Sequence, residues 1–182
     1  MAKKSGSRLR IIGGKWRSRM LPIADAEGLR PTTDRVRETL FNWLQPSIYG
    51  AKVLDVFAGS GALGFEALSR EAESAVLLEK HKQAAKNLSD NAKTLGATNA
   101  QVFQTDALTW LKTCDQRFDL IFLDPPFNKG LLPNCIDLIN DHNLAGQNGW
   151  VYIESESELS DLPIPKHWHL HREKKAGTVM LI

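Results

Sequence analysis

Apolar residues follow two different periods along most of the chain. From residue 52 onward, short apolar runs predict strands at 53–57, 75–79, 101–104, 118–123 and 150–153. Between these runs, apolar residues recur every three or four positions and predict helices at 62–70, 84–95, 107–112 and 131–139. Such alternation of strand and helix favours a mostly parallel, doubly wound α/β sheet with helices on both faces.

The carboxyl-terminal pattern departs from this alternation. Residues 168–172 and 178–182 are two short strand-like runs, and a turn containing Gly177 separates them. This arrangement predicts a terminal hairpin, which adds antiparallel strands to one edge of the parallel sheet.

The amino-terminal pattern predicts an extension rather than a further strand–helix unit. Residues 8–21 predict a small hairpin, and apolar residues at helical spacing predict a helix over 33–44. Residues 45–51 contain Pro46 and Gly50, which favour a domain boundary. We therefore expect an extension over residues 1–46 and the main domain over 47–182.

Composition narrows the class of protein. The 182 residues are 42% hydrophobic and 24% charged, as in soluble globular proteins. No apolar stretch is long enough to cross a bilayer, and the polar, basic start does not resemble a secretory signal. The two cysteines, Cys114 and Cys135, lack metal-type spacing and are expected to be free thiols. These features predict a cytoplasmic protein without a membrane partner.

Charge is distributed unevenly along the chain. Residues 1–40 contain ten Lys or Arg and only four Asp or Glu, although the whole chain has a net charge of only +2. A basic extension on a mildly acidic body indicates an anionic partner, such as a nucleic acid. A solvated basic tail would give the same count, so charge alone does not decide between the two.

A glycine-rich segment, DVFAGSGALG at residues 55–64, follows the first predicted strand of the main domain. Glycines let the chain turn sharply there, and the amide groups that begin the next helix can face a ligand. Gly59, Gly61 and Gly64 also satisfy a dinucleotide-binding pattern, with Glu79 placed to accept ribose hydroxyls. The segment predicts a nucleoside-containing cofactor without deciding which one.

A second candidate site, Asp124-Pro125-Pro126-Phe127, directly follows the fourth predicted strand. The first and fourth strands of a doubly wound sheet lie side by side, so this turn is expected beside the glycine-rich loop. Two prolines fix the local backbone and leave carbonyl groups free to accept hydrogen bonds, while Phe127 offers a flat apolar face. The turn suits a planar base that carries an amine.

The chemistry of such an amine explains these residue types. Its lone pair is delocalised into the ring, which makes it a poor nucleophile. The Asp124 carboxylate and the Pro125 carbonyl can accept its two N–H bonds and aim the lone pair at a methyl sulfonium, while Phe127 stacks on the base. Methyl transfer to an exocyclic amine follows as the predicted reaction.

Five segments together resemble a known family. Residues 55–64 resemble the first cofactor motif of Rossmann-fold methyltransferases, and Asp124–Phe127 resembles the fourth motif of methyltransferases that act on adenine or guanine amines. The blocks RIIGGKW at 10–16 and RPTTDRVRE at 30–38, with LFNWL at 40–44, resemble the bacterial 16S rRNA (guanine(966)-N2)-methyltransferase family. The resemblance covers nearly the whole chain.

The resemblance implies a Rossmann-like methyltransferase sheet of seven strands, S-adenosyl-L-methionine as cofactor, and 16S rRNA within the 30S subunit or its assembly intermediates as partner. We expect a monomer. Block 30–38 would close over the site. The implied cofactor-binding residues are Asp55, Phe57, Gly59, Ser60, Gly61, Glu79, Asp106 and Ala107. The implied catalytic residues are Asp124, Pro125, Pro126 and Phe127. The implied RNA-binding residues are Arg10, Lys15, Arg17, Arg30, Arg35 and Arg37.

Several alternatives stay open. The glycine-rich loop also fits a nicotinamide-dependent oxidoreductase, and the Asp124 turn also fits an N6-adenine methyltransferase acting on DNA or RNA. A non-catalytic RNA-binding module is a third alternative. No metal is expected, because the alternating histidines at 167, 169 and 171 have no patterned acidic or cysteine partner. Trp150 and Tyr152 are interpreted as sheet packing, and the glutamates at 154, 156 and 158 as a solvated acidic run.

Overall fold

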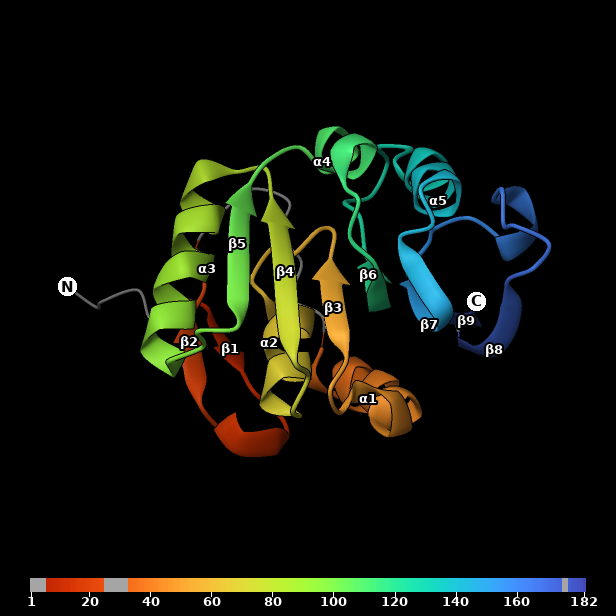
Figure 1. Ribbon diagram of the computed structural model, residues 1–182. Helices are drawn as coiled ribbons and strands as arrows, with labels where there is room; N and C mark the ends of the chain where they lie inside the picture. The colour runs from red at the N-terminus through yellow and green to blue at the C-terminus, as the bar shows by residue number, and fades with distance from the viewer. Residues whose placement is uncertain (1–5, 25–32, 175–176) are drawn as a thin grey trace.

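The computed structural model describes residues 6–24, 33–174 and 177–182, and its centre is a seven-stranded sheet with the order β5-β4-β3-β6-β7-β9-β8 (Figure 1). Five parallel strands form most of it: β3 (Lys52–Asp55), β4 (Ser74–Glu79), β5 (Ala100–Gln104), β6 (Phe118–Leu123) and β7 (Ala145–Ile153). The terminal hairpin adds β8 (His169–Lys174) and β9 (Gly177–Leu181), and β9 pairs antiparallel with both β7 and β8. The predicted fold class is confirmed.

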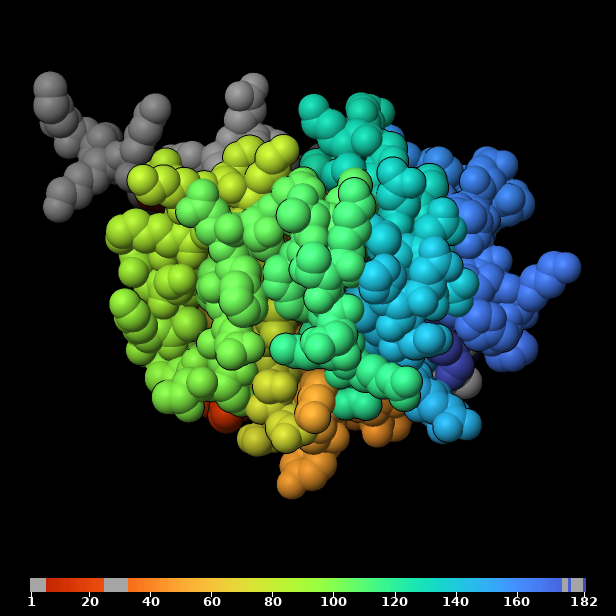
Figure 2. Space-filling view, turned by 45° about the horizontal axis from the view of Figure 1, so that its top comes forward, coloured from red at the N-terminus to blue at the C-terminus, as the bar shows by residue number. Residues whose placement is uncertain are grey.

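Helices cover both faces of the sheet and bury two separate apolar clusters. One cluster packs under α1 (Asp34–Ile48), α2 (Ala62–Ser69) and α3 (Lys82–Leu95). The other packs under α4 (Ala107–Thr113) and α5 (Leu132–Asp141), which form one continuous outer surface between α3 and the segment after β7 (Figure 2). A short 3-10 helix, η2 (Leu159–Asp161), lies in that segment. None of the helices in the described ranges combines the length and apolar character needed to span a membrane.

The amino-terminal extension packs on the first cluster. Strands β1 (Arg8–Arg10) and β2 (Met20–Pro22) form the predicted hairpin, with Leu9 opposite Leu21. The short 3-10 helix η1 (Gly14–Trp16) lies between them and buries Trp16. Because these side chains share a cluster with α2 and α3, the hairpin is held by the core of the main domain.

Helix α1 continues through the segment that was predicted to be a boundary. Thr33 caps its start by accepting the Val36 amide, and the helix passes Pro46 to end at Ile48. Proline removes one helical hydrogen bond, but Pro46 lies on the exposed side of the helix, where water can solvate the unpaired carbonyl. Leu44 and Ile48 on the opposite side are buried in the core, and their packing outweighs that loss. The helix therefore ends four residues later than predicted, while the division into an extension and a main domain stays a prediction.

Candidate active site

The glycine-rich loop joins β3 to α2 in a conformation that only glycine adopts easily. Gly59 and Gly61 have φ angles of 55° and 84°. A Cβ atom on Gly61 would lie 2.5 Å from the Phe65 ring and 2.8 Å from Leu88 Cδ2. The loop therefore needs glycine both for its backbone and for the close packing of α2 on α3.

Glu79, the last residue of β4, fixes this loop. Its Oε2 accepts a hydrogen bond from the Gly59 amide and its Oε1 accepts one from the His81 amide, both at 3.0 Å. The residue predicted to bind ribose thus lies beside the loop, as its place in the sequence indicated. Each carboxylate oxygen keeps further acceptor capacity for a hydroxyl.

Asp55, the last residue of β3, is buried under the same loop. Its Oδ2 accepts the Gly64 amide at 3.1 Å, while its Oδ1 is buried without a hydrogen-bond partner in the described part of the chain. Burial raises the pKa of the Asp55 carboxyl to about 7. An unsatisfied buried acceptor costs free energy, so this oxygen is suited to a cationic or hydrogen-bond-donating ligand.

The remaining predicted cofactor residues lie at neighbouring strand ends. Asp106 follows β5 and caps α4, where its Oδ2 accepts hydrogen bonds from the amide and the hydroxyl of Thr109, both at 3.1 Å. Ala107 is buried, and Phe57 packs partly buried against the cluster under α4 and α5. Ser60 is half-buried in the glycine-rich loop.

The Asp124 turn lies beside the glycine-rich loop, because β6 pairs directly with β3. Asp55 is opposite Phe122 in this pairing, and the Val56 amide donates to the Phe122 carbonyl at 3.2 Å. Asp124 and Pro125 are half-buried, whereas Pro126 and Phe127 are exposed, with Phe127 37% accessible. The predicted adjacency of the two candidate sites is confirmed.

Glu154 is a member of this site that the sequence interpretation missed. Leu123 and Ile153 are partners in the parallel pairing of β6 and β7, so Asp124 and Glu154 both follow the last paired residues of neighbouring strands. The two carboxyl groups are hydrogen-bonded to each other, and Tyr152 Oη lies 3.3 Å from Glu154 Oε2. Burial and the neighbouring Glu154 raise the pKa of Asp124 to about 8.

The interpretation of Glu154 as part of a solvated run is therefore wrong, while Glu156 and Glu158 are exposed as expected. The signal that could have found it is simple: an acid directly follows each of two neighbouring parallel strands.

Two of the predicted RNA-binding residues lie far from this edge of the sheet. Lys15 and Arg17 are exposed at η1, which contacts the last turn of α2, since the Trp16 amide donates to Ser69 Oγ at 3.0 Å. The glycine-rich loop lies at the other end of that helix (Figure 1). Arg10 and Arg35 are also exposed, and Arg30 lies outside the described residues.

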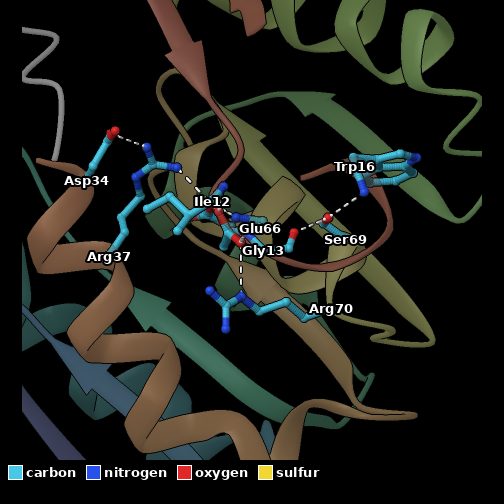
Figure 3. A network of polar contacts seen from close by, with 10 residues as sticks. Ile12, Gly13, Trp16, Asp34, Arg37, Glu66, Ser69 and Arg70 are labelled. Atoms are coloured by element: carbon cyan, nitrogen blue, oxygen red, sulfur yellow. Dashed lines mark hydrogen bonds and ion pairs between the residues drawn. The ribbon is translucent and has the colours of Figure 1, made fainter. Parts of the chain in front are cut away.

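Arg37 is a correction to the predicted RNA-binding set. Its side chain is 1% accessible, and its guanidinium contacts Asp34 Oδ1 at 2.8 Å and Glu66 Oε1 at 3.5 Å (Figure 3). A buried guanidinium that is already paired with two carboxylates cannot reach a phosphate of a large RNA in this conformation. Arg37 lies on the side of α1 that packs against the core, so its side chain is buried and its role is structural.

Glu66 is the centre of the network around Arg37 and was not singled out in the sequence. Its carboxylate accepts the Ile12 amide at 2.8 Å, the Gly13 amide at 3.0 Å and Arg70 Nε at 2.9 Å (Figure 3). It thereby ties the amino-terminal hairpin to α2, the helix that follows the glycine-rich loop.

Known proteins are similar to this chain over nearly its whole length. A family model described as "Conserved hypothetical protein 95" matches residues 9–182. Ribosomal RNA small subunit methyltransferase D of Escherichia coli (strain K12) is 51% identical over 176 residues, covering 96% of this chain and 89% of that protein. The Haemophilus influenzae protein of the same name is 46% identical over 175 residues, covering 94% and 90%.

A solved structure agrees with these matches. A putative methyltransferase from Escherichia coli superposes with a TM-score of 0.90 at 48% identity, covering 96% of this chain and 98% of that one. These relatives favour neither the oxidoreductase nor the adenine methyltransferase alternative. The resemblance noted in the sequence is confirmed: the chain belongs to the ribosomal RNA small subunit methyltransferase D family.

Proposed function

We propose that this protein transfers a methyl group from S-adenosyl-L-methionine to the exocyclic N2 amine of a guanine in 16S rRNA, with guanine 966 as the expected position. The observation that carries the proposal is the juxtaposition of the glycine-rich loop with the Asp124 turn on adjacent strands β3 and β6. The names of the relatives, which are rRNA small subunit methyltransferases, support the same reaction.

The residues of the loop fit the proposed cofactor. The donor supplies an electrophilic methyl group on a positively charged sulfonium. The unpartnered Oδ1 of Asp55 is a buried acceptor suited to the cationic end of such a ligand. Glu79 would accept ribose hydroxyls and Asp106 would accept the adenine amine, since both lie at the carboxyl ends of neighbouring strands.

The Asp124 turn would hold the target base. The Asp124 carboxyl and the Pro125 carbonyl would accept the two N–H bonds of the amine, which concentrates electron density on nitrogen and orients its lone pair. Phe127 would stack on the base, which must be unpaired to enter. Holding the amine in line with the methyl group supplies most of the acceleration.

The basic extension would contribute to RNA affinity. Arg10, Lys15, Arg17 and Arg35 are exposed, so each can approach a phosphate. Because Lys15 and Arg17 lie at the far end of α2 from the loop, they would contact RNA some distance from the reacting base. A substrate with extended structure, such as the 30S subunit or an assembly intermediate in the cytoplasm, would satisfy both contacts with one monomer.

Methyl transfer from labelled donor tests this proposal directly. We expect N2-methylguanosine after nuclease digestion of 16S rRNA from 30S particles that lack the modification, with less product from naked rRNA and none from DNA. Asp124→Ala should abolish the product while leaving donor binding measurable by calorimetry. Methylated adenine, or equal activity on DNA, would contradict the proposal.

A further inference from the structure

The carboxyl group of Glu154 lies where the proposed reaction must control a proton. We propose that Glu154 is a positioning residue for methyl transfer: it shares one proton with Asp124, fixes the Asp124 carboxyl toward the amine, and carries away the proton that the amine releases. This inference rests on the proposed function and deepens it by adding a second acid to the site.

The pairing of β6 with β7 makes this contact. Leu123 is opposite Ile153, and the Glu154 amide donates to the Leu123 carbonyl at 2.9 Å. The backbone of Glu154 is therefore held at the base of the Asp124 turn, and the two carboxyl groups meet through a hydrogen bond. Tyr152, buried on the same strand, places its hydroxyl 3.3 Å from Glu154 Oε2.

A hydrogen bond between two carboxyl groups requires a proton on one of them. Two ionised carboxylates in hydrogen-bonding contact would repel each other, and burial adds to the cost, so the pair holds one proton and one negative charge. The nearby groups reinforce this state: Asp55 on β3 is a third acid, and the Tyr152 hydroxyl is neutral, with its pKa raised by burial and by Glu154. The cation Lys174, at the end of β8, lines a groove with Tyr152.

The proton balance of the reaction explains the need for a second acid. As the new N–C bond forms and the S–C bond breaks, the nitrogen acquires a positive charge and must lose one proton. Asp124 accepts that proton, which changes the pair from one negative charge and one proton to neutral with two protons. In the complex the base would cover Asp124, whereas Glu154 is half-buried beside it, so Glu154 would release the surplus proton to water and restore the pair.

Glu154→Gln tests the role without removing the side chain's bulk. Gln can hydrogen-bond to Asp124 but cannot share or release a proton. We expect kcat to fall by roughly 10- to 100-fold with little change in KM for the donor, together with a shifted pH dependence of kcat. Glu156→Gln is the matched control, because Glu156 is two residues away and exposed, and its kinetics should equal those of the wild type.

A measurement on the free protein separates this inference from the proposed function. Carboxyl-carbon NMR of the protein without donor should show Asp124 titrating at lower pH in Glu154→Gln than in the wild type, and unchanged in Glu156→Gln. Circular dichroism and donor calorimetry check folding of each variant. A wild-type protein that methylates no rRNA would overturn the proposed function. An active wild type whose Asp124 titration and kcat are unaffected by Glu154→Gln would overturn the role of Glu154 alone.

Discussion

Arg37 Nη1 of α1 lies 3.5 Å from Glu66 Oε1 of α2, and both side chains are buried. The same guanidinium contacts Asp34, whose side chain is 58% accessible. The ion pairs of Arg37 therefore reach the surface at the start of α1. Glu66 in turn holds the amides of Ile12 and Gly13. One buried carboxylate therefore joins the amino-terminal hairpin, α1 and the helix that follows the glycine-rich loop.

Removing this carboxylate should destabilise the whole protein. Glu66→Ala would leave the buried Arg37 with Asp34 alone and would remove the acceptor of the Ile12 and Gly13 amides. Breaking a buried pair from one side costs about 3–5 kcal/mol. Urea denaturation followed by circular dichroism measures the change. Arg35→Ala is the control, since Arg35 is exposed on the same helix and should change stability by about 0.5 kcal/mol or less. Equal stability of the two variants would contradict the structural role of Glu66.

The glycine-rich loop should not tolerate a side chain at Gly61. In Gly61→Ala the residue keeps a φ of 84° and the added Cβ atom would lie 2.5 Å from the Phe65 ring. We therefore expect a lower Tm and a loss of donor binding, which calorimetry would measure. Gly96→Ala is the matched control, because Gly96 has a φ of 66° but nothing within 4 Å of the added carbon. That variant should lose about 1 kcal/mol and keep donor binding. Comparable donor affinity in both variants would show that the crowding at Gly61 is unimportant.

Stability of the free protein should fall as pH rises from about 4 to about 8. Burial raises the pKa of Asp55 to about 7 and that of Asp124 to about 8, whereas both titrate near 4 in the unfolded chain. In that window the folded state keeps protons that the unfolded state has released, so increasing pH favours unfolding. Thermal denaturation at a series of pH values measures this slope.

Asp124→Asn isolates one of these two contributions. Because the variant cannot acquire the buried negative charge, its Tm at pH 8 should exceed that of the wild type, while methyl transfer is lost. Asp137→Asn, at an exposed position on α5, should leave both the Tm and its pH dependence unchanged. A Tm for Asp124→Asn below the wild-type value at pH 8 would refute the assignment of a destabilising charge to this site.

The exposed basic residues of the extension should act on RNA affinity rather than on chemistry. Arg17→Ala is expected to weaken 16S rRNA binding and to reduce the slope of log K against log salt by roughly 0.7–0.9, as for one lost phosphate contact. Filter binding at several salt concentrations provides the slope. Lys112→Ala removes an exposed charge on α4 and should leave the slope unchanged. Identical slopes for the two variants would remove Arg17 from the RNA-binding surface.

The sequence was informative where structure depends on neighbouring residues. The runs that became β3, β4 and β6 were predicted within one or two residues, because buried parallel strands are short, continuous apolar segments. The glycine-rich loop was also predictable from local sequence, since glycine adopts positive φ without steric cost, as Gly59 and Gly61 do. The neighbouring placement of β3 and β6 followed from the general topology of doubly wound sheets.

The sequence by itself therefore determined the α/β alternation, the glycine-rich loop and the Asp124 turn, all of which are encoded by local periodicity and backbone preference. Only the tertiary structure decided which charges are buried. Arg35 and Arg37 differ by two positions on one helix, yet one is exposed and the other is paired with Glu66. Glu154 and Glu156 differ in the same way beside Asp124. Burial of a charge depends on the surface that packs against it, and in both cases that surface comes from a distant part of the chain.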